Sequence, residues 1–87
     1  ELGYVTPDGY GPMPPGFEWG NNNTLAEHAQ WIADAVSLSA RSGRVRLVII
    51  WNYNVFSAPG SPDPAGGYSI VRPDGSCPAC NSLAARR

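Results

Sequence analysis

Lysine is absent from this sequence, and charge of either sign is scarce. All six basic residues among the 87 are arginine, against seven aspartate and glutamate residues, and the net charge is −1. This balance gives no electrostatic reason to expect nucleic acid or an anionic membrane as a partner. No apolar run approaches the ~20 residues that a membrane-spanning helix needs. The single histidine, His28, excludes a metal site built on several imidazoles, so we expect no metal and no cofactor and interpret His28 as a solvated helix residue.

An initiator methionine and a signal sequence are also missing, so we expect Glu1 to be a processed, nicked or arbitrary start. Glycine and proline, ten and nine residues, crowd into residues 3–20 and 57–75 and are almost absent from 24–56. This distribution predicts long loops, at 1–23 and at 52–75, on either side of an ordered block.

A helix is predicted over residues 24–42. Thr24 and Glu27 have the spacing of a capping box, in which each side chain satisfies a backbone N–H at the helix start. Apolar residues then recur at helical spacing, and Gly43 after Arg41 suits a left-handed C-terminal cap. The residues of this apolar stripe are Leu25, Ala29, Ile32, Val36 and Ala40, widened by Trp31, Ala35 and Leu38.

A strand is predicted over residues 45–51, two residues after that helix. The run from Val45 to Trp51 does not alternate after Arg46, which is typical of a parallel strand covered on both faces. Helix, tight turn and buried strand together indicate an α/β fold. Val5 and residues 68–71 are the short neighbours that this chain offers. We therefore expect another chain, or the rest of a larger domain, to pair with the strand.

The C-terminal part is predicted to hold a short extended segment at 68–71 and a helix over 76–86. Ser76 is placed to cap that helix, with Pro78 in its first turn. Cys77 and Cys80 form a Cys-x-x-Cys at the helix start, for which structural thiols or a local disulfide are favoured over redox or metal chemistry.

The order of the motifs resembles the end of a family of known enzymes. Glu-x-Gly at residue 1, a Pro/Gly-rich loop, a helix with Gln-Trp-Ile, and Trp-Asn-Tyr-Asn at 51–54 precede Asp-Pro-x-x-Gly-Tyr-Ser-Ile-Val-Arg-Pro-Asp-Gly-Ser at 63–76. This order, over roughly residues 1–85, is similar to the C-terminal part of clan A glycoside hydrolases of the cellulase-like or xylosidase-like kind. The resemblance implies the last quarter of a (β/α)8 barrel, from the end of the seventh strand to the eighth helix.

The resemblance also implies roles for individual residues. Glu1 matches the carboxylate that acts as the catalytic nucleophile, and Trp51 matches the aromatic residue that stacks on the sugar. Asn52 and Asn54 follow it on a loop at the catalytic face and are implied to bind substrate. Tyr68 and Arg72, in the last βα connection, are assigned packing roles.

The second carboxylate of a retaining glycosidase, the general acid/base, lies in a part of that family which this sequence does not contain. Retaining hydrolysis needs two carboxyl groups about 5 Å apart, and none of the remaining acidic residues has a spacing that argues for a partner to Glu1. We therefore expect a fragment that is inactive alone and that binds carbohydrate only within an intact parent. The alternative is a non-catalytic structural or interaction module of a larger extracellular assembly, extracellular location being favoured by the resemblance alone.

Other interpretations of the same residues stay open. Glu1 is equally read as a solvated chain end, and Trp51 as a core aromatic at the end of a strand. Trp19 and Trp31 are expected to be packing residues. Asn22-Asn23-Thr24 fits a glycosylation sequon, a short motif of low specificity.

Overall fold

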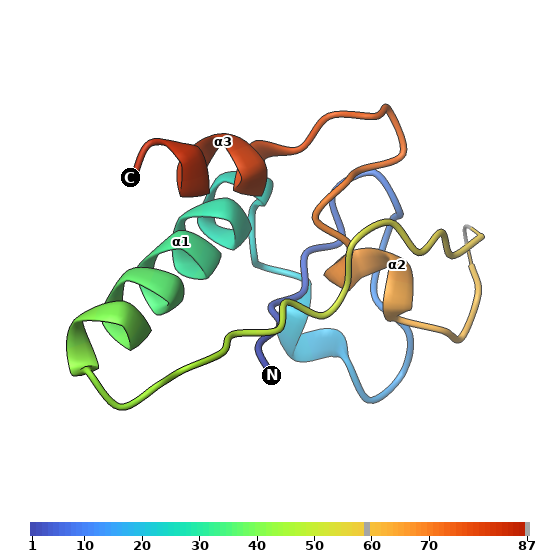
Figure 1. Ribbon diagram of the computed structural model, residues 1–87. Coiled ribbons are helices and arrows are strands. Elements are labelled where there is room, and N and C mark those ends of the chain that lie inside the picture. The colour runs from blue at the N-terminus through green and yellow to red at the C-terminus, as the bar shows by residue number, and fades with distance from the viewer. Residues whose placement is uncertain (59, 87) are drawn as a thin grey trace.

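The computed structural model describes residues 1–58 and 60–86 of the chain. Within these residues the regular secondary structure consists of helices, and there is no regular strand. They are a 3-10 turn η1 (Glu18–Gly20) and the α-helices α1 (Leu25–Ser42), α2 (Ala65–Tyr68) and α3 (Pro78–Ala84). In Figure 1, α3 lies beside α1 on one side of the molecule, and the loops with η1 and α2 form the other side.

The predicted α/β fold, the C-terminal quarter of a (β/α)8 barrel, is wrong for this chain. Residues 45–51 do not form a strand, and their only ladder contact among the described residues is an isolated parallel bridge between Leu2 and Ile50. The segment is also exposed rather than buried, with Leu47 at 73% and Ile49 at 52% of full exposure. The physical reason is the shortage of neighbours, because a strand apolar on both faces needs backbone partners on both edges.

Helix α1 begins one residue later than predicted and ends at the predicted residue. Thr24 is its N-cap, and the capping box with Glu27 is present in both directions, with Glu27 N–H donating to Thr24 Oγ1 at 3.1 Å. Gly43 closes the helix in the left-handed conformation, at φ 69°. The buried face comprises His28, Ala29, Ile32 and Ala33. It is narrower than the predicted stripe, since Leu38 is 59% exposed.

The buried apolar residues form two clusters. The first joins α1 to α3 through Ala29, Ile32, Ile70 and Ala79, and Tyr4 and Leu83 pack against its edge. The second holds the loops together around three residues, Val5, Tyr10 and Met13. Gly67 of α2 fits against this second cluster, because a Cβ there would lie 2.8 Å from Val5 and 2.9 Å from the Met13 sulfur.

Arg72 fastens the loops to one another from inside the molecule. Its guanidinium is buried and donates to the carbonyls of Ser69 at 2.7 Å and Asp8 at 2.5 Å, with longer bonds to Thr6 and Gly67. It also lies 5.1 Å from the centre of the Tyr10 ring, a cation–π contact. Arg72 thus packs in the interior through hydrogen bonds to backbone carbonyls and a cation–π contact.

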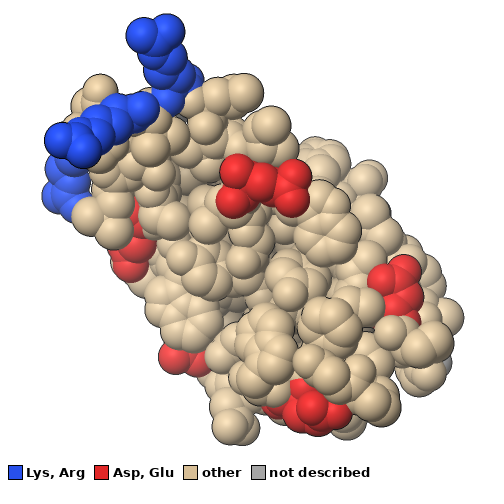
Figure 2. All heavy atoms as spheres, turned by 90° about the horizontal axis from the view of Figure 1, so that it is seen from below, with Lys and Arg blue, Asp and Glu red and all other residues tan. Residues whose placement is uncertain are grey.

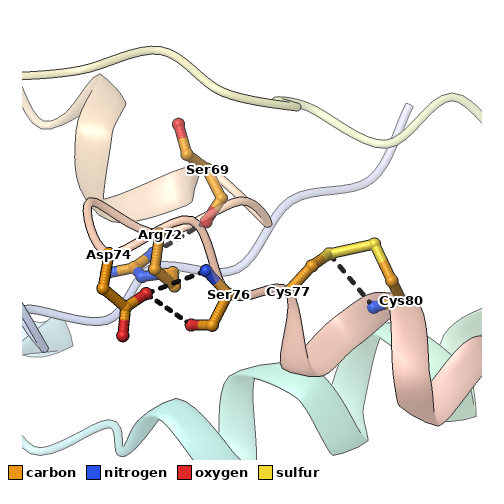
Figure 3. Close-up of a disulfide and its surroundings, with 6 residues drawn as sticks. All are labelled: Ser69, Arg72, Asp74, Ser76, Cys77 and Cys80. Atoms are coloured by element: carbon orange, nitrogen blue, oxygen red, sulfur yellow. Dashed lines mark hydrogen bonds between the residues drawn. A yellow bond between two sulfur atoms is a disulfide. The ribbon is translucent and has the colours of Figure 1, made fainter.

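The turn that leads into α3 differs from the predicted cap. Ser76 does not cap the helix; it donates from its backbone and its hydroxyl to Asp74, and Cys77 is the N-cap. Figure 3 shows this turn beside Arg72, with a disulfide between Cys77 and Cys80 closing the first turn of α3. The predicted helix over 76–86 is therefore shorter, at Pro78–Ala84. Segment 68–71 is the end of α2 followed by two backbone bonds, from Ile70 to Asn52 and from Val71 to Tyr53.

Candidate functional site

Glu1 and Trp51, 50 positions apart in the sequence, line the same open pocket. Its volume is about 400 Å³, and its other walls include the aromatic rings of Phe17 and Tyr68. This volume falls within the ~300–1,000 Å³ of small-molecule sites. Glu1 is the one carboxylate among the described residues that line it. The lining thus combines one acidic residue with three aromatic residues.

The parallel bridge between Leu2 and Ile50 brings the N-terminal segment and the 45–51 segment together at this pocket. Leu2 N–H donates to the Ile49 carbonyl at 2.8 Å, and Trp51 N–H donates to the Leu2 carbonyl at 2.8 Å. These two bonds pair Leu2 with Ile50, so Glu1 lies beside Ile49 and Gly3 lies beside Trp51. Gly3 then lets the backbones approach, because a Cβ at this position would lie 2.7 Å from the Trp51 carbonyl oxygen.

The aromatic wall of the pocket is held by ring contacts. Trp51 and Tyr68 meet edge to face with their centroids 5.1 Å apart, which is a favourable geometry for two aromatic rings. Trp51 remains 42% exposed, so one part of its surface is available to a ligand. Tyr68, which was assigned a packing role, therefore also forms part of the pocket. The sequence feature that indicates a role for Tyr68 is the preceding pair Gly66-Gly67. These two glycines allow the backbone of α2 to pack closely against the loops.

The two asparagines do not join this pocket. Asn52 is buried, its amide N–H donates to the Ala65 carbonyl at 2.9 Å, and its Oδ1 accepts from Val55 N–H at 3.3 Å and contacts the Ser69 hydroxyl. These bonds fix the 52–55 turn, so Asn52 has a structural role in this structure. Asn54 is exposed and is not among the residues that line the pocket.

Charge around the pocket is sparse. Figure 2 shows basic side chains gathered at one end of the molecule and acidic side chains separated from one another on the face in view. Arg41, Arg44 and Arg46, at the end of α1 and just after it, are exposed. Within residues 1–58 and 60–86 no group of three or more histidine, cysteine, aspartate or glutamate side chains is placed to hold a metal ion.

His28 is buried, so its expected place on the solvated surface is wrong. Burial and the nearby positive charge of Arg72 lower its pKa from 6.5 to about 4, against a smaller upward effect of the Tyr4 and Tyr68 backbone. Neither ring nitrogen makes a well-formed hydrogen bond to any described residue. His28 is thus a neutral core residue between α1 and the loops, outside the pocket.

The other tryptophans divide between packing and exposure. Trp31 is half-buried, and its ring lies 5.8 Å from that of Tyr4. Trp19, in η1, is 62% exposed, so the packing role predicted for it is wrong. Its ring lies 6.3 Å from that of Phe17. Trp19 is therefore an exposed tryptophan that does not line the pocket of Trp51.

Comparison of the chain with known protein families, with characterised proteins and with solved structures gives no match. None of the helices described in residues 1–58 and 60–86 has the length and apolar character needed to cross a bilayer.

Proposed function

We propose that this chain is a part of a retaining glycoside hydrolase, with Glu1 as the nucleophile and Trp51 as the platform on which the sugar stacks. The observation that carries the proposal is the shared pocket of Glu1 and Trp51. The motif order Glu-x-Gly … Trp-Asn-Tyr-Asn implies a sugar site that holds both residues, and their shared pocket supports the proposal. The proposal concerns the site and makes no use of a barrel fold.

In the proposed chemistry, the apolar C–H face of a pyranose lies on the exposed part of Trp51. This places the anomeric carbon next to the Glu1 carboxylate, which attacks it and forms a glycosyl ester while the leaving oxygen takes a proton from a second carboxyl group. No other carboxylate among the described residues lines the pocket, so that acid comes from polypeptide outside this chain. The isolated chain then keeps weak sugar binding and lacks turnover.

The proposal is tested by sugar affinity in two matched tryptophan variants. Trp51→Ala should weaken binding of cellotetraose or xylotetraose by about tenfold or more, equivalent to about 1.4 kcal/mol. Trp19→Ala removes an equally large and more exposed indole outside the pocket and should leave the affinity unchanged. Equal effects of the two substitutions, or no saturable binding of either sugar by the wild-type chain, would contradict the proposal.

A second candidate function is a non-catalytic interaction module of a larger, extracellular assembly. The observation that favours it is a row of exposed apolar side chains at alternate positions from 45 to 55, comprising Val45, Leu47, Ile49, Trp51, Tyr53 and Val55. Their exposed fractions run from 42% to 73%. Exposed large apolar side chains gathered in one segment are typical of an interface. Under this candidate, another chain covers the segment, and Trp51 contributes to that interface instead of binding a sugar.

A further inference from the structure

The disulfide between Cys77 and Cys80 joins two residues that the fold already holds together. The two cysteines are only three positions apart, and the bond lies within the first turn of α3. The Asn81 N–H donates to the Cys77 carbonyl at 3.2 Å, so a backbone hydrogen bond closes the same turn. The stability that a disulfide gives through chain entropy grows with the length of the loop that it closes, and this loop is a single turn. Stabilisation of the fold is therefore a minor effect of this bond.

Helix α3 is held against α1 by contacts that do not need the disulfide. Ala79 is 1% exposed and belongs to the cluster that joins the two helices, and Leu83 packs against the same cluster. The Arg86 side chain adds a salt bridge to Asp34 of α1 at 2.7 Å. None of these contacts involves a sulfur atom, so reduction of the bond does not remove them. We therefore expect the chain to keep its fold with both cysteines as free thiols.

The two sulfurs have different surroundings. Both cysteines are only partly buried. The Cys80 N–H donates to the Cys77 sulfur at 3.3 Å, as Figure 3 shows, whereas residues 1–58 and 60–86 place no such donor on the Cys80 sulfur. No acidic residue lies in the first turn of α3. A hydrogen-bond donor at a sulfur, without an acidic side chain in the same turn, favours the thiolate at that sulfur, so Cys77 is the better site for the negative charge.

We propose that Cys77 and Cys80 form a thiol–disulfide exchange site, which takes an electron pair from two thiol groups of a reductant. A thiolate of the reductant attacks the Cys80 sulfur, the bond between the two cysteine sulfurs breaks, and Cys77 leaves as a thiolate. Cys80 is then joined to the reductant in a mixed disulfide. A second thiolate of the reductant attacks the reductant's own sulfur in that mixed disulfide and releases Cys80. The reductant is oxidised to a disulfide, the chain is reduced by two electrons, and the two protons of the attacking thiols go to Cys80 and to solvent.

The hydrogen bond from the Cys80 N–H decides which sulfur is attacked. The sulfur that leaves with the better stabilised negative charge leaves faster, so Cys77 is the leaving group and Cys80 receives the incoming thiol. Metal binding is the other chemistry of this spacing and needs about four ligands. Within the described part of the chain no group of three or more histidine, cysteine, aspartate or glutamate side chains is placed to supply them. The exchange site is independent of the sugar pocket, whose lining contains no residue of α3.

The first measurement is the redox equilibrium of the wild-type chain with glutathione as the probe thiol. The chain is equilibrated without oxygen in about 10 mM reduced and about 1 mM oxidised glutathione, quenched with acid, alkylated and analysed by mass spectrometry. We expect at least about one chain in ten to carry two alkyl groups, because exchange sites have redox equilibria near that of glutathione. A chain that stays fully oxidised holds a structural disulfide, and this result overturns the proposal.

The second measurement separates the two sulfurs. Cys80→Ser keeps the Cys77 sulfur and the backbone N–H at position 80, and Cys77→Ser is its matched control, with a sulfur that lacks this donor. Iodoacetamide at neutral pH should alkylate Cys80→Ser at least about threefold faster than Cys77→Ser, since the thiolate is the form that reacts. In denaturing urea the two rates should become equal, because the hydrogen bond is lost. Equal rates in the folded variants contradict the proposal.

The third measurement tests whether reduction leaves the fold intact. Far-UV circular dichroism of the reduced chain, and of the double variant Cys77→Ser/Cys80→Ser, should show the helix content of the oxidised chain. Loss of the helices in either sample would mean that the bond holds the fold together, and the proposal would then be wrong. Sugar binding by the Trp51 pocket enters none of these measurements, so failure of the exchange site is distinguishable from failure of the proposed function.

Discussion

The indole of Trp51 meets the ring of Tyr68 edge to face, with 5.1 Å between the ring centroids. Tyr68 is the last residue of α2, and Trp51 follows the bridge to Leu2, so this contact joins the N-terminal segment, the 45–51 segment and α2 at one point. Glu1 lines the same pocket from the N-terminal side. Gly3 lies where these segments approach, since a Cβ there would lie 2.7 Å from the Trp51 carbonyl oxygen and 3.2 Å from the Tyr68 ring.

Replacing Gly3 by alanine should disturb the pocket. The added Cβ would lie 2.7 Å from the Trp51 carbonyl and 3.2 Å from the Tyr68 ring, so one backbone must move. We expect a loss of about 1–3 kcal/mol in the free energy of unfolding, as for other overpacked sites. Urea unfolding followed by Trp fluorescence measures it. An unchanged midpoint together with an unchanged Trp51 indole shift would show that residues 1–3 do not lie against Trp51.

The chain alone should not hydrolyse aryl glycosides, because one carboxylate in the pocket cannot act both as nucleophile and as acid/base. The measurement is release of nitrophenol from aryl β-glucoside and β-xyloside by a homogeneous sample. Turnover that disappears in Glu1→Ala would show that the chain holds a complete active site and would contradict this account.

Arg72 should contribute far more to stability than a surface arginine. In Arg72→Met the carbonyls of Ser69 and Asp8 lose a charged donor inside the protein, and we expect a loss of about 2–4 kcal/mol in the free energy of unfolding. Arg86→Met is the control, because its salt bridge to Asp34 at 2.7 Å is partly exposed and such pairs contribute about 0–1 kcal/mol. Equal losses in the two variants, measured by urea unfolding, would mean that Arg72 does not hold the loops together.

The free energy of unfolding should fall as the pH drops from 6.5 toward 4, because His28 is neutral in the fold. Its folded pKa of about 4 lies below the ordinary value of 6.5, so the unfolded chain binds a proton first. The contribution of neutral His28 to the free energy of unfolding is fully present above pH 6.5. It declines as the pH falls through this window and is absent below about pH 4. The difference amounts to about 3 kcal/mol, since each pKa unit is worth about 1.4 kcal/mol.

The control for this pH dependence is His28→Gln, which keeps a polar side chain and does not titrate. Its free energy of unfolding should change little between pH 6.5 and 4.5. This range lies above the ordinary pKa values of aspartate, about 3.9, and glutamate, about 4.3. If wild type and His28→Gln lose stability in parallel over this range, the titrating group is not His28.

Local features of this fold could be predicted from the sequence, and long-range ones could not. The capping box of Thr24 and Glu27 and the closure of α1 at Gly43 depend on residues within one helical turn, so their spacing is sufficient. The lowered pKa of His28 depends on its burial and on the charge of Arg72, 44 positions away, which no spacing reveals. The prediction of a strand over 45–51 was wrong for a related reason. An apolar run shows that a segment is able to pair as a strand, but it does not show whether the chain supplies a partner strand.

The candidate site shows the same division. Glu1 and Trp51 could be expected together from the order of motifs, and they do line one pocket. Asn52 was expected beside Trp51 on the substrate face, yet its amide bonds to the carbonyl of Ala65 in α2. Helix α2 itself was not predicted, because four residues with two glycines carry no helical periodicity.

The most direct test of the proposed sugar site is the set of three tryptophan indole signals in one NMR titration of the chain with xylotetraose or cellotetraose. Trp51 lines the pocket, Trp31 packs against Tyr4, and Trp19 is exposed elsewhere, so two of the three signals are internal controls. We predict a saturable shift of the Trp51 indole N–H with Trp31 and Trp19 unmoved. A shift confined to the Trp19 signal would contradict the account. So would three signals that stay in place at a sugar concentration of about 10 mM, which exceeds the dissociation constant of about 1 mM expected for a weak site.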